Sequence, residues 1–385
     1  MDNVEDHTFW IALGHLPGWQ TGRINDLIVD IREKRRLSFG ELFEMEPEEW
    51  MSAFDLKPQE CLDLAEAKRS LPEHALLAEE LVKQGAEIVP IWSEHYPMTL
   101  KKHLKCSNAP PLLYTVGNER LLQESTVVVV GAHSASEAAM SFVEAFAARC
   151  SEERRVAVVS GFEKAADSAA ALDSTLKYEG RQIIVLPQGI LASATVLNRY
   201  KARITEGDVV MLSPFFPGAS RKEELTAMCT VYLYALAEEI YVAEAIESRA
   251  RGSTWEGIMN ELSRGRRIYV RSSRPGEKNA NELLIAKGGI PVDDEGQVLT
   301  GRPLRSTAPF RQLHFGPTRN DFETKIRSLL STLAEPVSAG KIKEQLRLEL
   351  DTRHLSRILK DLEFVRATKS EKGLFQFTIK EDNSG

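Results

Sequence analysis

The chain has 385 residues, of which 43% are hydrophobic and 27% are charged. This composition is ordinary for a globular protein and excludes a wholly disordered or collagen-like chain, and the length predicts two or three domains. The 49 Lys and Arg residues against 56 Asp and Glu give a formal net charge of −7. That charge excludes a global positive field, so a nucleic acid would have to bind through local patches.

Four cysteines, Cys61, Cys106, Cys150 and Cys229, are far apart and form no Cys-x-x-Cys pair. Neither a disulfide framework nor a Cys-rich zinc site is expected, and we predict no metal. The acidic start lacks an apolar signal core, and no run approaches 18 apolar residues. We therefore predict a cytoplasmic protein with no membrane contact.

Residues 1–118 are predicted to form a helical domain, similar to a SAM or helix-hairpin-helix unit, followed by an extended lead-in. The turn Leu16-Pro17-Gly18-Trp19 resembles the hairpin of the latter unit, although packing is the simpler role for Trp19. A short strand is expected at Glu87–Trp92, and the prolines at 110 and 111 indicate extended chain that runs to Asn118.

Residues 119–292 are predicted to form a Rossmann-like α/β core with a doubly wound parallel sheet. Mostly apolar, β-branched runs recur, as in strands buried on both faces, at 126–130, 156–159, 182–186, 208–212, 239–242 and 267–270. Helix-period segments lie between them, and three open with the capping-box pattern of Ser and then Glu three residues later, at Ser134, Ser220 and Ser253. Alternating strands and helices predict right-handed crossovers.

The polar stretch 293–320 is predicted to be a linker, and residues 321–385 a winged-helix domain of three helices and a hairpin. Residues 317–380 contain 13 Lys and Arg against 9 Asp and Glu. Basic residues on the third helix and the wing would meet DNA phosphates; these are Arg353, Arg357, Lys360, Lys369 and Lys372. The alternative is a winged helix that contacts only protein.

Ligands of open parallel sheets bind at the carboxyl ends of the strands. The turn at Gly131 enters a helix whose N–H groups suit a phosphate, and Arg249 and Arg251 precede the helix predicted to be capped by Ser253. The alternatives are an ordinary βα turn and a solvated loop. The sequence contains neither Gly-x-Gly-x-x-Gly nor Walker A, so we expect no nicotinamide or P-loop nucleotide chemistry and no cofactor.

Several motifs resemble the DNA-processing protein A (Smf) family over residues 8–380. Tyr96-Pro97 and Gly117-Asn118 match its lead-in, and Val130-Gly131-Ala132-His133-Ser134-Ala135-Ser136 matches its first loop. Ser160-Gly161 through Asp167 resembles its second loop, and Glu244-Ala245, Arg251-Gly252-Ser253 and Asn281-Glu-Leu-Leu-Ile285 resemble later motifs. Two loop arginines of the family are His133 and Lys164 here, and its Arg-Arg-Asn-Arg stretch is replaced by Met228–Tyr232, which we expect to be buried helix.

The resemblance implies a Rossmann-like core that binds single-stranded DNA, a homodimer, and delivery of DNA to a RecA-type recombinase. It also leaves open an antitoxin role beside a cognate toxin in phage defence. Together with the reasoning from the strand ends, it predicts phosphate contacts from Gly131, His133, Ser134, Ser136, Ser160, Gly161, Lys164, Arg249, Arg251 and Ser253.

Two alternatives remain open. A nucleotide-sensing scaffold would hold a small nucleotide at the same strand ends and bind a partner effector protein. A phosphoribohydrolase-like enzyme would use Glu256, although Glu256 is more simply the capping partner of Ser253. We predict a protein that is not an enzyme, because no nucleophile, base and orienting group can be identified together.

Overall fold

The structure is a computed structural model, and it divides into two compact units, Met1–Arg305 and Ser306–Gly385. It describes residues 4–131, 136–161, 180–248, 253–299, 326–331, 336–346, 352–362, 365–369 and 375–379. The domain boundaries expected from the sequence stay a prediction.

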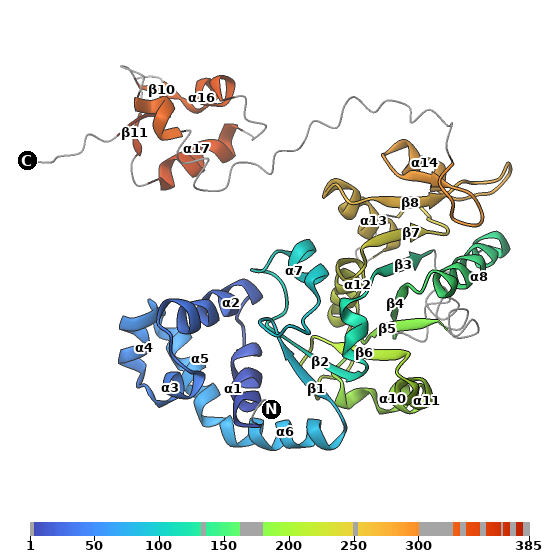
Figure 1. The fold of residues 1–385 in the computed structure, drawn as a ribbon. Coiled ribbons are helices and arrows are strands. Elements are labelled where there is room, and N and C mark those ends of the chain that lie inside the picture. Colours follow the sequence, from blue (N-terminus) through green and yellow to red (C-terminus); the bar gives the residue numbers. More distant parts are fainter. Residues whose placement is uncertain are drawn as a thin grey trace, which may run out of the picture. The chain divides into compact units, whose positions relative to one another are not determined.

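A nine-stranded, mostly parallel sheet forms the centre of the first unit, in the order β1-β2-β6-β5-β4-β3-β7-β8-β9 (Figure 1). Six neighbouring pairs, from β6 through to β9, are parallel, whereas β1–β2 and β2–β6 are antiparallel. The strands are β1 (Glu87–Pro90), β2 (Leu112–Gly117), β3 (Thr126–Val130), β4 (Val156–Ser160), β5 (Arg181–Val185), β6 (Val209–Ser213), β7 (Glu239–Val242), β8 (Ile268–Arg271) and β9 (Ile290–Val292). The predicted α/β class with a doubly wound sheet is therefore confirmed.

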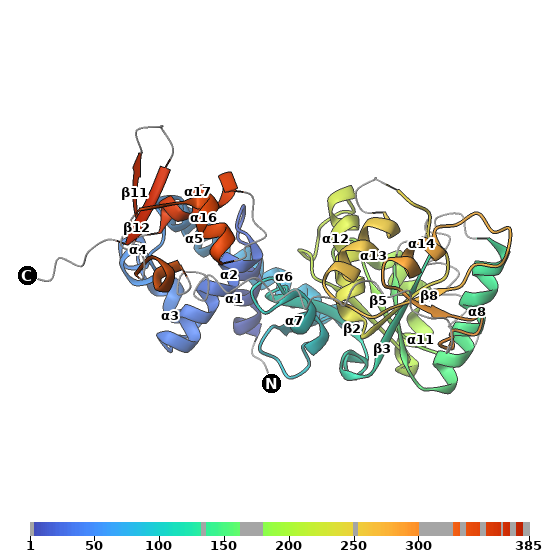
Figure 2. The same cartoon turned by 90° about the horizontal axis from the view of Figure 1, so that it is seen from above.

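Helices cover both faces of the sheet (Figures 1 and 2). One face carries α8 (Glu137–Glu152), α10 (Ala194–Arg199) and α11 (Lys201–Glu206), and the other carries α12 (Glu223–Leu236), α13 (Thr254–Ser263) and α14 (Asn281–Ala286). The change of face follows from strand order, because the chain moves outward from β3 to β6 and then returns to β7 on the other side of β3. This reversal creates a topological switch point between β3 and β7, where such sheets bind ligands.

The N-terminal helices pack into the same hydrophobic core as the sheet. They are α1 (Val4–Gly14), α2 (Thr21–Val29), a π-helical turn (Asp30–Lys34), α3 (Phe39–Glu44), α4 (Pro47–Phe54), α5 (Pro58–Arg69), α6 (Leu71–Lys83) and α7 (Met98–Leu104). Local sequence explains several starts: Ser38 and Glu41 form a reciprocal capping box before α3, and Pro47 and Pro58 begin α4 and α5. Trp50 anchors the bundle, being fully buried with its Nε1 donating to the Leu42 carbonyl at 2.8 Å.

Two predicted helix starts are wrong. Helix α8 begins at Glu137 with Ser136 as N-cap, so Glu137 is not three residues into a helix capped by Ser134, which itself lies outside the described residues. Helix α12 begins at Glu223 after Lys222, and Ser220 does not cap it. Ser253 does cap α13, as predicted, and its Oγ accepts from the Glu256 N–H at 3.2 Å.

The second unit has its own small core, which contains Ile342, Leu355 and Phe377. Its three-stranded antiparallel sheet has the order β10-β12-β11. Its elements include β10 (Val337–Ser338), α16 (Ala339–Gln345), α17 (Thr352–Asp361), β11 (Val365–Lys369) and β12 (Phe375–Ile379). The winged-helix assignment of this unit stays a prediction.

Candidate functional site at the carboxyl edge of the sheet

The carboxyl ends of β3, β4 and β7 bring together part of the predicted phosphate site. Gly131, Ser136 and Ser253 belong to the loops at the β3–β7 switch point, whereas Ser160 ends the neighbouring β4 and Gly161 directly follows it. The remaining members of the predicted set lie outside the described residues; they are His133, Ser134, Lys164, Arg249 and Arg251.

A carboxylate occupies the N-terminal end of α8, where a phosphate was expected. Glu244 is only 6% exposed, and its Oε2 accepts from the Ser136 N–H at 2.9 Å and from the Ser136 Oγ–H at 2.5 Å. Ser136 Oγ in turn accepts from the Ala139 N–H at 3.2 Å. The positive helix end therefore already has an anionic partner from the end of β7.

The opposite wall of the switch point is built from α13. Thr254 donates its Oγ1 hydrogen to the Gly131 carbonyl at 3.0 Å, which ties the β3 loop to the first turn of α13. Trp255 in that turn is buried, so it packs in the core and offers no stacking surface. Because Ser253 caps the helix and Thr254 holds Gly131, both hydroxyls have structural roles beside the expected phosphate path.

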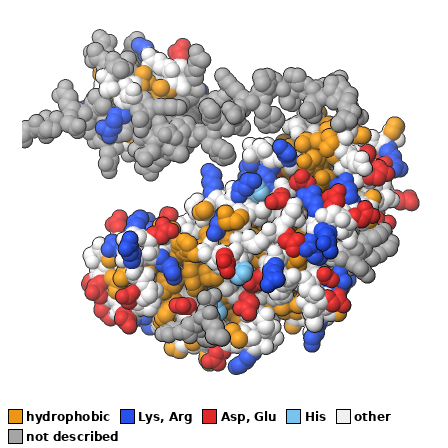
Figure 3. Space-filling model, in the orientation of Figure 1, with side chains coloured by type: hydrophobic (Ala, Val, Ile, Leu, Met, Phe, Trp, Pro, Cys, Tyr) orange, Lys and Arg blue, Asp and Glu red, His pale blue; other side chains and the backbone are white. Residues whose placement is uncertain are grey.

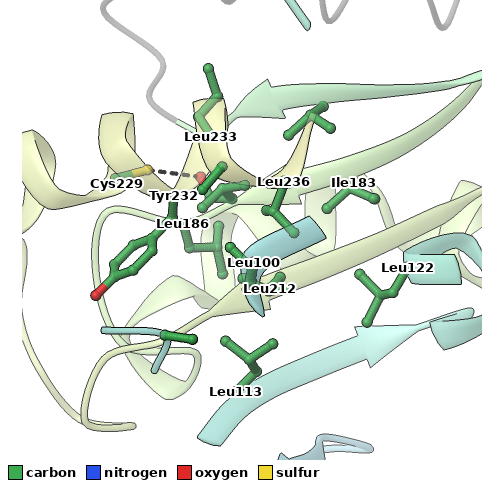
Figure 4. Packing of buried hydrophobic residues seen from close by; sticks show 14 of the residues in the cluster. Leu100, Leu113, Leu122, Ile183, Leu186, Leu212, Cys229, Tyr232, Leu233 and Leu236 are labelled. Carbon is green, nitrogen blue, oxygen red and sulfur yellow. Dashed lines mark hydrogen bonds between the residues drawn. The ribbon is translucent and has the colours of Figure 1, made fainter. Parts of the chain in front are cut away.

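Gly161 lies where the chain leaves β4 with little space around it. Its N–H donates to the Val185 carbonyl at 2.8 Å, and a Cβ there would lie 2.9 Å from Leu186 Cδ2. Beneath it, Cys229 Sγ donates to the same Val185 carbonyl at 3.4 Å (Figure 4). Burial raises the pKa of the Cys229 thiol to about 12, against a smaller opposing effect of a hydrogen bond with Ser160, so the thiol is neutral and unreactive at pH 7.

The expectation that Met228–Tyr232 is buried helix is only half right. Cys229 and Tyr232 are buried against the sheet, as Figure 4 shows, but Met228 and Val231 are 42% and 44% exposed. Helix α12 therefore presents the apolar side chains of Met228 and Val231 to solvent.

The sequence did not reveal the structural roles of two buried residues at this edge, Asn281 and Arg271. Asn281 accepts from the Ala245 N–H at 2.8 Å and donates to the carbonyls of Ala243 (3.0 Å) and Arg271 (2.8 Å), so it joins the ends of β7 and β8. The sequence motif contains Asn281, but it gives no indication of these three hydrogen-bond partners. Arg271 is fully buried, and its hydrogen bonds to Glu277 hold the pKa of that carboxyl below its usual range.

Positive charge at the opposite, amino edge is largely neutralised. Arg155 pairs with Glu239 at 2.7 Å and Arg181 with Glu124 at 2.5 Å. On the face that Figure 3 shows, Lys and Arg side chains of the described residues are interspersed with Asp and Glu. Local groups rather than a broad field must therefore attract an anion to this unit.

In the second unit, α17 carries Arg353, Arg357 and Lys360, and β11 ends at Lys369. Of these side chains the structure describes only Lys360, which is exposed and places its Nζ 3.3 Å from the centroid of the Phe375 ring. Lys372 lies outside the described residues. The DNA contacts expected of this unit stay predictions.

Among the described residues, no group of three or more His, Cys, Asp or Glu side chains is placed to hold a metal ion. None of the described helices has the length and hydropathy needed to cross a bilayer.

Comparisons with known proteins place this fold among relatives. The family model described as "DNA recombination-mediator protein A" matches residues 87–301. The X-ray structure of DNA processing protein A from Streptococcus pneumoniae is 19% identical, with a TM-score of 0.58 over 77% of this chain and 97% of that one. That of Helicobacter pylori, titled for its single-stranded DNA binding mode, is 15% identical, with a TM-score of 0.42 over 54% and 90%. No curated protein matches the chain.

Proposed function

The chain belongs to the DNA recombination-mediator protein A family, and from that premise we propose that it binds single-stranded DNA along the carboxyl edge of its core sheet and acts in DNA processing. The observation that carries the proposal is the extent of the family match, residues 87–301, which contains every strand of the nine-stranded sheet. The main DNA contacts are therefore assigned to the sheet and its loops.

The chemistry of the edge supports a phosphate chain rather than one fixed phosphate. Glu244 already satisfies the N-terminal end of α8, so a single anion would have to displace a buried carboxylate. A strand that passes along the loops after β3, β4 and β7 would instead draw on cations that the sequence places there, among them Lys164, Arg249 and Arg251. With few cations, binding should be modest in affinity and should weaken only gradually as the salt concentration rises.

The proposal also concerns the proteins with which the chain would associate. A homodimer and a RecA-type recombinase would suit DNA processing, whereas a cognate toxin would suit a defence role. One affinity purification from cells, analysed for protein and nucleic acid together, separates them. Recovery of a recombinase with DNA supports the processing role, and recovery of a toxin-like protein supports the antitoxin role.

A salt series of oligothymidylate binding tests the proposed interface. We expect the triple variant His133→Ala/Lys164→Ala/Arg251→Ala to bind about tenfold more weakly at low salt. The slope of log K against log salt should flatten by about 1.4, because two cations are lost and each contributes about 0.7 on single strands.

The matched control removes two cations from the amino edge, Arg120→Ala/Arg154→Ala, both exposed in the structure. It should leave affinity and slope close to those of the parent chain. Equal binding by the parent and the triple variant at low salt would refute the proposed interface. Competition by mononucleotides but not by oligonucleotides would favour the nucleotide-sensing scaffold instead.

A further inference from the structure

A cavity of about 660 Å³ lies in the first unit between the α1–α2 turn, the segment Pro110–Pro111, and the loop from β6 to α12. That volume is in the range that small-ligand sites occupy in proteins. Its β6 side begins with Pro214–Phe216, directly after the carboxyl end of β6. The cavity therefore continues the edge to which the single strand was assigned above.

Aromatic side chains form its walls. The His15 ring stacks on Tyr114 at a centroid distance of 5.8 Å and meets Phe216 edge-on at 5.4 Å. His15 Nε2 also shares a hydrogen bond with Tyr114 Oη at 2.9 Å. Because Tyr114 is fully buried in β2, it fixes His15, which in turn supports Phe216. Phe216 is thus held in place while 39% of its surface remains exposed, which makes it an accessible aromatic surface.

Trp19 completes the wall from the side of the α1–α2 turn. Its Nε1 donates to Asp63 Oδ2 at 3.0 Å, and the Arg23 guanidinium lies 5.6 Å from its ring centroid. These contacts hold the indole in place at the cavity lining. Flat, ordered aromatic groups are the surfaces on which unstacked bases pack in single-strand binding proteins.

The charges around the cavity suit a ligand with an anionic backbone. Among the described residues that line it, none is Asp or Glu, and Lys222 supplies a cation. Burial lowers the pKa of His15 to about 4, with His74 adding to the effect, so this wall is neutral at pH 7. The acidic residues near Trp19 are engaged, Asp63 by the indole and Glu60 by Arg23 at 2.9 Å.

We propose that this cavity, walled by His15, Trp19 and Phe216, holds one unstacked nucleobase of the single strand, while Lys222 contacts the adjoining phosphate. The inference rests on the proposed function, because it needs a strand that follows the carboxyl edge. It adds a base-stacking subsite formed jointly by the N-terminal helices and the sheet. Stacking tolerates every base, so the subsite adds affinity with little sequence preference.

The test uses the full chain and two oligonucleotides with the same phosphates, an oligothymidylate and a matched strand whose sugars lack bases. Phe216→Ala should weaken binding of the oligothymidylate about tenfold and leave the abasic strand unchanged. Phe216→Trp should restore the affinity. Lys222→Gln should weaken both strands alike, because it removes a phosphate contact.

Met51→Ala is the control, since Met51 is similarly exposed (44%) but lies on α4 and does not line the cavity. It should change neither affinity, and thermal melts should show that all variants are folded. If Phe216→Ala affects both strands equally or neither, the base subsite is wrong while strand binding stands. If the parent chain binds neither oligonucleotide, the proposed function fails and the subsite fails with it.

Discussion

Glu244 decides how the switch point can be used. A carboxylate held by the N–H and Oγ–H of Ser136 blocks the place where Rossmann-like sheets commonly seat a phosphate. Glu244 belongs to a recognisable sequence motif, but nothing in the sequence links it to Ser136, which lies 108 positions earlier. Long-range contacts of this kind explain why the sequence predicts an edge of the sheet for the phosphate site but not the geometry of that site.

The charge of Glu244 should oppose a nearby strand. We expect Glu244→Gln to raise the affinity for oligothymidylate about fivefold at low salt, because the amide can still accept from Ser136 but no longer repels phosphates. Fluorescence anisotropy titrations at low and high salt would measure the gain, which should shrink as salt rises.

Glu206→Gln serves as the control, because Glu206 ends α11 and pairs with Arg203 away from the switch point. Its affinity should stay at the parent value. Unchanged binding by Glu244→Gln at all salt concentrations would mean that the strand does not pass this carboxylate.

At the scale of elements, strands were predicted more accurately than helix ends. The run 126–130 coincides with β3, and the other five predicted core strands lie within one residue of β4 to β8 at each end. Continuous β-branched runs buried on both faces identify such strands locally. The starts of α8 and α12 were missed because Ser134 and Ser220 satisfied a local pattern that the tertiary structure does not use.

The lead-in to the core also differs from expectation. The segments that contain β1 and β2 were expected to be a short strand and extended chain before the core, yet both are hydrogen-bonded into the core sheet. Strand β2 pairs antiparallel with β6, so Gly117 lies beside Val210 on the neighbouring strand. A pairing across about a hundred residues leaves no periodic signal in the sequence, and only the three-dimensional structure reveals it.

The loop between β5 and α10 depends on a close backbone approach. Gly189 donates its N–H to the Ala219 carbonyl at 2.8 Å, and a Cβ at this position would lie 2.2 Å from the Pro217 carbonyl oxygen. We expect Gly189→Ala to lower the free energy of unfolding by about 3 kcal/mol, because backbone rather than a flexible side chain must move. Denaturant unfolding at neutral pH would measure the loss.

Gly218→Ala is the matched control in the facing loop. Its Cβ would meet only Phe216 Cε1 at 3.9 Å, an ordinary contact. This variant should be close to the parent in stability. If the two alanine variants were equally stable, the close approach of the loops would not be present in solution.

At the scale of the whole molecule, the two units contain different candidate features for DNA binding. The first unit contains the sheet, the switch point and the aromatic cavity, and the second has a separate core and an excess of basic residues in its sequence. Their compositions alone allowed either unit to be the main DNA-binding element. The family match over residues 87–301 lies within the first unit, which is why we assign the strand to the sheet.

The most direct test of this assignment is cross-linking of a photoreactive oligothymidylate to the full chain, with the adducts mapped by mass spectrometry. We predict that adducts concentrate on peptides from the loops after β3, β4, β6 and β7, including residues 131–136, 160–164, 214–222 and 249–253. Adducts confined to residues 306–385 or to the amino edge of the sheet would contradict the assignment.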